Sequence, residues 1–313
     1  MIENRSFRSQ IYGMCIWWYP RKGWLCYDVT LIDVWAEHVK AIQENGLIIN
    51  ENGSDIIIKN IKAVTDPREV GEVDLVIVLV KATVTEQAME GAKSLIGENT
   101  RVLTLQNGLD NIEKLIKVVG KEKVLAGVTE HGANMLAPGR VQHAGTGDTI
   151  IGELDGKLSN SLRKIGSVFE KAGLRVCYSN NVMGALWRKL LVNVGINALT
   201  AITGLRNGRL IELEETDELL KMAVREAVSI ANAKGIDLEL ADPVEHVRDV
   251  ARMTGKNRSS MLQDVTKKRK TEIEVINGAI VKEGVQLGIS TPVNKVLYNL
   301  VRVREKTYDE VNI

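Results

Sequence analysis

The stretch Val73-Asp-Leu-Val-Ile-Val-Leu-Val80 is apolar at every position except Asp74. Such a run predicts a strand buried on both faces, as in a parallel sheet covered by helices. Further strands are predicted at 28–33, 100–106 and 124–129, and helical patterns separate them at 37–45, 85–96 and from Gly108 to Val119. Alternation of strand and helix predicts a doubly wound α/β sheet.

The pattern changes along the second half of the chain. Residues 132–156 are rich in glycine and predict short strands, followed by a helix at 158–172 and a last strand at 173–178. Beyond Ser179 only helical patterns remain, at 181–202, 215–234, 243–253, 271–287 and 292–306. We therefore expect a dinucleotide-binding α/β domain at 1–179 and an all-helical substrate and catalytic domain at 180–313.

Composition excludes several classes of protein. The 313 residues are 44% hydrophobic and 26% charged, which is ordinary for a globular protein. The 41 basic residues nearly balance the 40 acidic ones, so the net charge favours neither nucleic acid nor an anionic membrane. The longest apolar run is too short to span a bilayer, and three cysteines without metal-ligand spacing suit a reducing, cytoplasmic location.

Residues 1–27 do not match the start of a dinucleotide-binding sheet. Such a sheet opens with a strand and a Gly-x-Gly-x-x-Gly turn, whose glycines let a pyrophosphate approach the backbone. Here the segment offers Gly13 and Gly23, with Trp17-Trp-Tyr-Pro20 between them. The simplest interpretation is an N-terminal extension.

The genetic code offers another interpretation of this segment. Read one nucleotide later, Trp17, Trp18 and Trp24 all become glycine, and the residues around them can read Met-Gly-Cys-Ala-Phe-Gly-Gly and Ala-Lys-Ala-Gly-Tyr. Our hypothesis is that two compensating frameshifts, in the gene or in its sequencing, have scrambled a phosphate-binding turn. Resequencing tests it, because one uninterrupted frame encoding the printed chain would refute it.

Three polar residues follow predicted parallel strands, at the edge where α/β sheets bind ligands. Asp33 is placed to accept hydrogen bonds from an adenosine ribose and to repel a 2′-phosphate, although an acid there can equally cap the next helix. Lys81 and Asn107 end two other strands, and their equivalent positions favour a role in ligand binding over ordinary loop polarity.

The helix over 185–202 carries a polar stripe on an otherwise apolar sequence. Lys189, Asn193 and Asn197 are spaced four residues apart and so share one face. Burying them unpaired costs about 1–3 kcal/mol each, whereas a stripe facing a cleft presents one cation and two amides to a ligand. The lysine is then placed to protonate a carbonyl oxygen as hydride reaches the carbon.

Two further residues complete the predicted site. Glu272, at the start of the last-but-one helix, is placed to orient the ammonium of Lys189, although a first-turn glutamate is also favoured by the helix dipole alone. Ser260 is placed to hold a substrate carboxylate, or else caps a helix. His131 and His143 lack a third ligand at metal spacing, so we expect no metal site.

Taken together, these motifs resemble the ketopantoate reductase (2-dehydropantoate 2-reductase) family. The resemblance rests on Val-Lys81, Leu-Gln-Asn107-Gly, Trp187-Arg-Lys189 with Asn193 and Asn197, Ser260-Met-Leu-Gln-Asp, and Thr-Glu272-Ile. It implies an N-terminal Rossmann-like doubly wound sheet and an all-helical C-terminal domain of the 6-phosphogluconate-dehydrogenase-like type. The implied reaction is reduction of ketopantoate to pantoate by NADPH or NADH, for pantothenate and coenzyme A synthesis.

The resemblance also implies roles for the residues. Lys189 is the expected proton donor with Glu272 as its partner, while Asn193, Asn197, Asn207 and Ser260 bind the 2-keto acid. Asp33, Lys81 and Asn107 bind the cofactor. The missing glycine turn leaves open an inactive homologue that binds no cofactor, and the same side chains would also suit a dehydrogenase of other branched or aromatic 2-hydroxy acids. A homodimer remains open.

Overall fold

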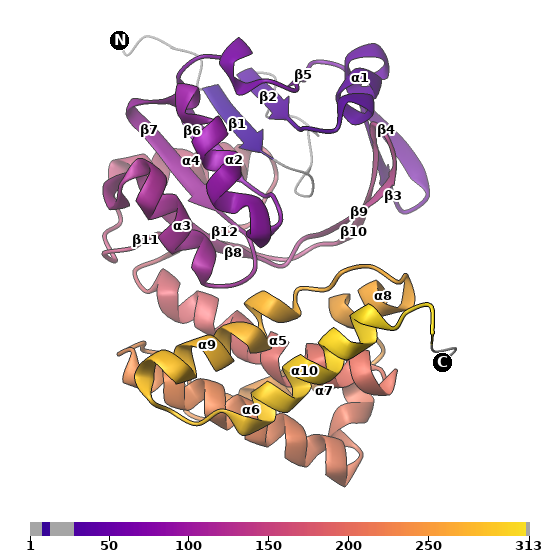
Figure 1. The fold of residues 1–313 in the computed structure, drawn as a ribbon. Coiled ribbons are helices and arrows are strands. Elements are labelled where there is room, and N and C mark those ends of the chain that lie inside the picture. The colour runs from indigo at the N-terminus through magenta and orange to yellow at the C-terminus, as the bar shows by residue number, and fades with distance from the viewer. Residues whose placement is uncertain (1–7, 13–27, 311–313) are drawn as a thin grey trace. The chain divides into compact units, whose positions relative to one another are not determined.

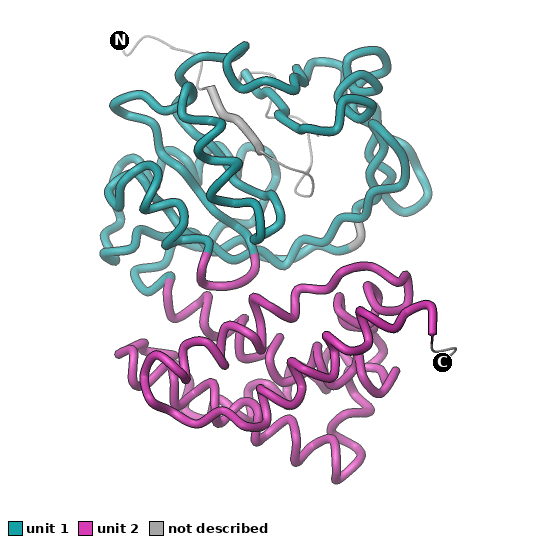
Figure 2. Tube along the Cα trace, in the orientation of Figure 1, with its two compact units in different colours: residues 1–106, 111–182 teal, residues 107–110, 183–313 magenta. Residues whose placement is uncertain are grey.

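The computed structural model describes residues 8–12 and 28–310 and divides the chain into two compact units. One unit contains Met1–Gln106 and Asn111–Val182, and the other contains Asn107–Asp110 and Met183–Ile313 (Figure 2). The short loop Asn107–Asp110 therefore groups with the helical unit, although its neighbours in sequence belong to the sheet.

The first unit is built on an eight-stranded sheet in the order β12-β11-β8-β7-β6-β1-β2-β5 (Figure 1). Neighbouring strands are parallel except for the pair β8 and β11. The strands are β1 (Arg8–Tyr12), β2 (Asp28–Ile32), β5 (Lys62–Val64), β6 (Val73–Val78), β7 (Ile96–Thr104), β8 (Val124–Thr129), β11 (Thr149–Glu153) and β12 (Val176–Ser179). The predicted Rossmann-like α/β class is confirmed, with one antiparallel pair that the sequence did not predict.

Strand β6 shows why the alternation of strands and helices could be predicted from the sequence. Leu75, Val76, Ile77 and Val78 are at most 4% exposed, because both faces of this central strand are covered. Helices and short 3₁₀ turns connect the strands: α1 (Ala36–Asn45), η2 (Pro67–Glu69), η3 (Ala82–Val84), α2 (Thr85–Gly91), η4 (Lys93–Leu95), α3 (Asp110–Val119), η5 (Lys121–Lys123) and α4 (Asn160–Lys171). The helix predicted over 85–96 is thus shorter, and β7 begins at Ile96.

A second, four-stranded sheet has the order β4-β3-β10-β9. It combines β3 (Leu47–Glu51), β4 (Ser54–Ile58), β9 (Gly132–Ala137) and β10 (Arg140–Gly145). The sequence analysis missed β3 and β4, although Asn52-Gly53 between two isoleucine-rich runs is a hairpin signal. Both turn residues have positive φ, 51° and 85°, as a type I′ turn requires.

Strand β1 occupies the place of the missing first strand. Residues 8–12 pair in parallel with β2 on one side and, from Ser9, with β6 on the other. The interpretation of residues 1–27 as an N-terminal extension is therefore wrong for residues 8–12, which form a strand of the sheet. Residues 13–27, where the frameshift hypothesis places the phosphate-binding turn, lie outside the described residues.

The second unit is helical. Its helices are α5 (Val182–Thr203), η6 (Asn207–Ile211), α6 (Glu214–Ala233), α7 (Pro243–Met253), α8 (Ser260–Thr266), η7 (Ile273–Val275), α9 (Asn277–Leu287) and α10 (Pro292–Lys306). The single helix predicted over 271–287 is wrong, since Ile276 leaves helical geometry (φ −106°, ψ −96°) and separates η7 from α9. No helix in the described ranges is long and apolar enough to cross a membrane.

Candidate active site

The carboxyl ends of β1, β2, β6 and β7 meet at one edge of the sheet, because these strands are parallel. Asp33 follows β2 at this edge, where its Oδ1 accepts a hydrogen bond from the amide of Trp35 (2.8 Å). That contact orders the turn into α1. Asp33 is not the N-cap of α1, since that position belongs to Trp35 and carries no side-chain cap. The ribose contact of Asp33 stays a prediction.

Lys81 lies just beyond β6, in the same unit. It is exposed and directly precedes the turn η3, and its carbonyl accepts a hydrogen bond from the amide of Val84 (3.0 Å). The turn fixes the backbone of Lys81 and leaves its ammonium at the surface, at the ligand-binding edge of the sheet.

Gln106 connects the ends of two strands, a role that sequence reasoning missed. Its Nε2 donates to the carbonyl oxygen of Val80 (2.5 Å) and to Oγ1 of Thr85 (2.9 Å). The Thr85 hydroxyl in turn donates to Oδ1 of Asn111 (2.8 Å). This buried network holds the segment with Lys81 against the end of β7. A glutamine after a strand carries no distinctive signal, so only the long-range contacts reveal it.

In the helical unit, the predicted polar stripe lies on α5. Lys189 and Asn193 are half-buried, and Asn197 is 5% exposed. The Asn197 side chain donates to Oγ of Ser260 across 3.5 Å, so two predicted substrate-binding residues lie together.

Ser260 is not the helix cap. The capping hydroxyl of α8 belongs to Ser259, which accepts the amide of Leu262 (3.0 Å) and lies 2.6 Å from Oγ1 of Thr200. Because Ser259 performs the structural role, the exposed Ser260 hydroxyl is available for a ligand.

Glu272 and Asn107 form a direct pair within this unit. The Asn107 side chain donates to Oε2 of Glu272 at 3.0 Å. Gly108 permits this approach, since its φ is +88° and a Cβ there would lie 3.0 Å from Cβ of Val275. Asp110 adds an ion pair with Lys282 (3.2 Å). The loop after β7 is thus anchored to η7 and α9, and it brings one predicted cofactor residue to one predicted catalytic residue.

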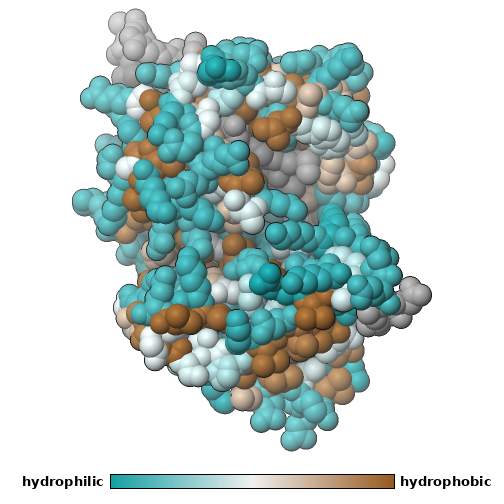
Figure 3. Space-filling model, viewed as in Figure 1, coloured by the Kyte–Doolittle hydropathy of each residue, from teal (hydrophilic) through white to brown (hydrophobic). Residues whose placement is uncertain are grey.

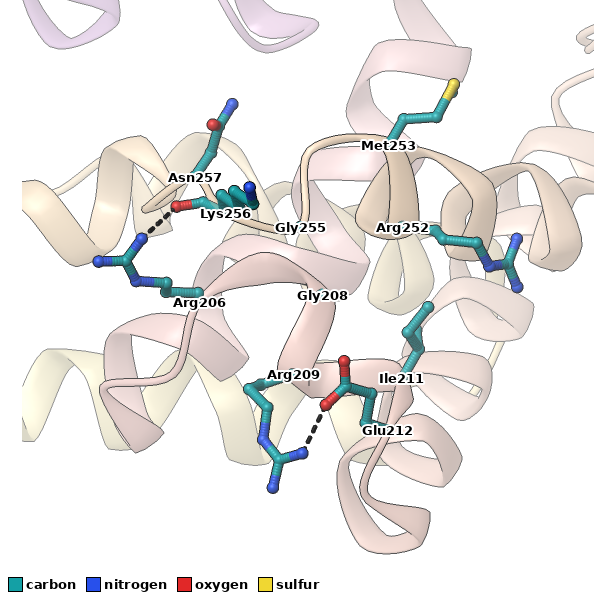
Figure 4. A pocket seen from close by; sticks show the side chains of 10 residues that line it. All are labelled: Arg206, Gly208, Arg209, Ile211, Glu212, Arg252, Met253, Gly255, Lys256 and Asn257. Atoms are coloured by element: carbon teal, nitrogen blue, oxygen red, sulfur yellow. Dashed lines mark hydrogen bonds and ion pairs between the residues drawn. The ribbon is translucent and has the colours of Figure 1, made fainter.

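Asn207 is buried in η6 and its amide is already engaged. Its Nδ2 donates to Oγ1 of Thr254 (3.0 Å), while Oδ1 has no hydrogen-bond partner among the described residues. A cavity of about 610 Å³ adjoins this turn, between η6 and the end of α7 (Figure 4). Its walls carry four cations, Arg206, Arg209, Arg252 and Lys256, and none of the polar residues of α5.

The two histidines of the first unit lie together, with ring centroids 5.9 Å apart. His143 lies 3.3 Å from Glu51 through its Nδ1. No group of three or more metal-ligating side chains occurs among the residues the structure describes.

Comparison with known proteins shows to which family this chain belongs. Residues 25–156 match the family described as ketopantoate reductase PanE/ApbA, and residues 181–305 match its C-terminal domain. The chain belongs to the ketopantoate reductase family.

Relatives and solved structures in this family cover most of the chain. It is 37% identical to a 2-dehydropantoate 2-reductase of Halobacterium salinarum, over 89% of this chain and 91% of that protein. One of Archaeoglobus fulgidus is 40% identical over 74% and 76% of the two chains.

Two solved structures have the same fold. A PanE/ApbA family ketopantoate reductase from Ralstonia eutropha has a TM-score of 0.83, with 32% identity over 97% of this chain and 100% of that one. D-mandelate dehydrogenase, solved with NADH and anilino(oxo)acetate, has a TM-score of 0.86, with 30% identity over 97% and 99%.

Proposed function

We propose that this member of the family reduces the ketone of 2-dehydropantoate to the hydroxyl of pantoate, with a nicotinamide cofactor as hydride donor. The observation that carries the proposal is the polar face of α5. It carries Lys189, Asn193 and Asn197, and Asn197 donates a hydrogen bond to Ser260. It supplies a cation, two amides and a hydroxyl, which match a 2-keto acid. Family membership supports the same reaction.

The sheet edge fits a dinucleotide. The strand order places β1 between β6 and β2, so connections leave in opposite directions at β1, which is where α/β sheets bind nucleotides. Asp33 and Lys81 lie at this edge, and we assign them to the cofactor together with Asn107. When bound, the nicotinamide supplies the hydride.

Lys189 is the proposed general acid. Its ammonium donates a proton to the carbonyl oxygen of the substrate while negative charge develops there. Asn193, Asn197 and Ser260 hold the keto acid through hydrogen bonds, and we keep Asn207 as a further substrate residue through its unpartnered Oδ1. We assign Glu272 to orienting Lys189, and Asn107 fixes one of the Glu272 carboxylate oxygens.

A second candidate substrate is an aromatic 2-keto acid. The similarity to D-mandelate dehydrogenase favours it, because that enzyme matches 97% of this chain at 30% identity. Steady-state rates with 2-dehydropantoate and with phenylglyoxylate distinguish the two. We expect a higher kcat/KM for 2-dehydropantoate, and the reverse order would assign the chain to aromatic hydroxy acids.

The choice of cofactor is a separate proposal. The carboxylate of Asp33 favours NADH, because it would lie against the 2′-phosphate of NADPH. Fluorescence titration of the printed chain with each nucleotide measures this preference. A parallel titration of a version carrying the shifted-frame sequence at 12–25 tests the inactive alternative, which requires that only this version binds.

Two further features, the cellular location and the oligomeric state, complete the proposal. We infer a cytoplasmic location, where the exposed thiol of Cys177 stays reduced. We also infer that the protein forms a homodimer.

A further inference from the structure

The cavity between η6 and the end of α7 carries an excess of positive charge (Figure 4). Four of the ten residues that line it are basic, and Glu212 is acidic. The whole chain has 41 basic and 40 acidic residues, so this excess is local. Apolar residues gather over much of the face of the helical unit that Figure 3 shows, so a cluster of cations is not typical of its surface. The cavity therefore has the charge that attracts an anion.

Acidic side chains already neutralise two of the four cations. Arg209 forms an ion pair with Glu212, and Arg252 forms one with Asp249. Each pair joins residues three apart in the chain, so it forms without a ligand. The positive charge that a ligand meets therefore comes mainly from the other two cations, which form no ion pair among the residues that the structure describes.

These two cations, Arg206 and Lys256, lie on the same side of the cavity in Figure 4. The Nη1 of Arg206 donates to the carbonyl oxygen of Lys256 (2.7 Å), which holds the guanidinium beside the backbone of the lysine. The exposed side-chain amide of Asn257 lies on the same side. The two positive groups repel each other when no anion is present, and both keep N–H donors that an anion can accept.

The backbone that carries these side chains is fixed by hydrogen bonds. The amides of Asn207 and Gly208 donate to the carbonyl oxygens of Asn257 and Gly255, both across 3.2 Å, and join η6 to the connection between α7 and α8. A Cβ at Gly208 would lie 2.8 Å from Cα of Gly255, so this close approach requires a glycine. A ligand would meet a preformed wall, which lowers the entropic cost of binding.

The available cations and the volume of the cavity indicate the class of ligand. One bidentate guanidinium satisfies a single carboxylate, whereas a guanidinium and an ammonium together match a dianion. A phosphate monoester carries a charge of about −1.5 to −2 at pH 7 and offers three acceptor oxygens. The volume of about 610 Å³ lies in the usual range of small-molecule sites, ~300–1,000 Å³, and leaves room for an organic group beside the phosphate. We propose that this cavity binds a small phosphomonoester, whose phosphate accepts hydrogen bonds from Arg206, Lys256 and Asn257.

This site is separate from the one assigned to the keto acid. Among the described residues, neither those of α5 nor Ser260 line the cavity. Asn207 does not line it either, and its side-chain amide donates to Thr254. The proposal therefore does not depend on the identity of the substrate, and its readout is the binding of a ligand rather than turnover.

Isothermal titration calorimetry with glycerol 3-phosphate tests the proposal, because this probe is a phosphomonoester without a keto acid or a nucleotide base. We expect saturable binding of one molecule per chain, and none of glycerol. Lys256→Gln removes one cation of the site and should weaken binding at least about tenfold, the order of magnitude of a lost charged hydrogen bond. Lys270→Gln is the matched control, because Lys270 is an exposed lysine of the same unit outside the cavity. It should leave the Kd unchanged.

Two further comparisons identify the ligand and its place. Inorganic phosphate should bind more weakly than glycerol 3-phosphate, and equal affinity would overturn the assignment to a monoester. Ser260→Ala, in the substrate site, should leave the Kd of glycerol 3-phosphate unchanged. Binding that is lost in Ser260→Ala but kept in Lys256→Gln would place the probe in the substrate site and overturn the proposal. So would binding that survives both Lys256→Gln and Arg206→Gln, or an unchanged chain that does not bind the probe at millimolar concentration.

Discussion

Lys189 is the residue on which the proposed chemistry depends most directly. If its ammonium protonates the carbonyl oxygen, Lys189→Ala should lower kcat by about 10²–10⁴-fold. Lys189→Arg keeps the positive charge but should remain impaired, since a guanidinium holds its proton too tightly to donate it. Stopped-flow oxidation of the reduced nicotinamide measures both rates.

The matched control for Lys189 is Lys164→Ala, because Lys164 is an exposed lysine on α4. It should leave kcat unchanged. A Lys189→Ala variant that turns over at nearly the wild-type rate would remove Lys189 from the role of acid.

His38 predicts a pH dependence of stability. It is 2% exposed, and its Nδ1 accepts the amide of Gly139 (2.9 Å), which requires a neutral ring. Burial lowers the pKa of His38, and the charge of Asp33 offsets this only in part. The unfolded chain, with a histidine pKa of about 6.5, therefore binds more protons once the pH falls below that value. The free energy of unfolding should decrease with falling pH until the folded pKa is reached.

Urea unfolding at about pH 7.5 and about pH 5.5, on either side of the free-histidine value, measures this effect. His131 and His246 also have pKa values lowered by burial and add to the same slope. The His38→Gln variant isolates the contribution of His38, because a glutamine oxygen can accept the same amide without titrating. Equal slopes for the two proteins would contradict the prediction.

At the scale of elements, a buried asparagine pair joins four helices. Asn294 of α10 donates to the carbonyl of Ala223 (2.9 Å) and to Glu226 (2.7 Å), and it accepts from Asn277 of α9 (2.9 Å). Asn277 also donates to the carbonyl of Val194 on α5 (3.3 Å). Asn294→Ala removes the buried bonds to Ala223, Glu226 and Asn277 and should lower the free energy of unfolding by about 1–3 kcal/mol.

Thermal and urea unfolding measure this loss. Asn299→Ala is the control, since Asn299 is an exposed residue of the same helix and its replacement should change stability little. A similar stability for both variants would show that the buried pair does not hold the helices together.

These asparagines show where sequence-based prediction ends. Periodicity revealed Asn193 and Asn197 because they interrupt an apolar face at regular spacing. Asn277 and Asn294 are as polar and more buried, yet they meet only through the packing of α9 on α10. A sequence does not distinguish an amide that binds a ligand from one that binds another helix. The same limit applies to Glu272, whose partner Asn107 is distant in the chain.

For the whole molecule, local patterns predicted most of the architecture. Buried strands such as β6 and the long amphipathic helices follow from side-chain periodicity, which depends on near neighbours alone. Strand β1 was missed because residues 8–12 lack the apolar run of a central strand. Short strands were predicted over 132–156, where β9 and β10 lie, but β3 and β4 were missed, and the pairing of β3 with β10 joins segments far apart in the chain.

Because the loop Asn107–Asp110 groups with the helical unit, the chain crosses between the two units more than once. The backbone passes between the two units after Gln106, after Asp110 and after Val182, so three peptide segments tether them. Leu109 packs against the helical core. A polypeptide ending at Val182 would therefore be left with an orphaned leucine and an unsupported loop at the edge where Lys81 lies. Cutting the chain after Val182 alone would still leave the loop its contacts with Glu272 and Lys282.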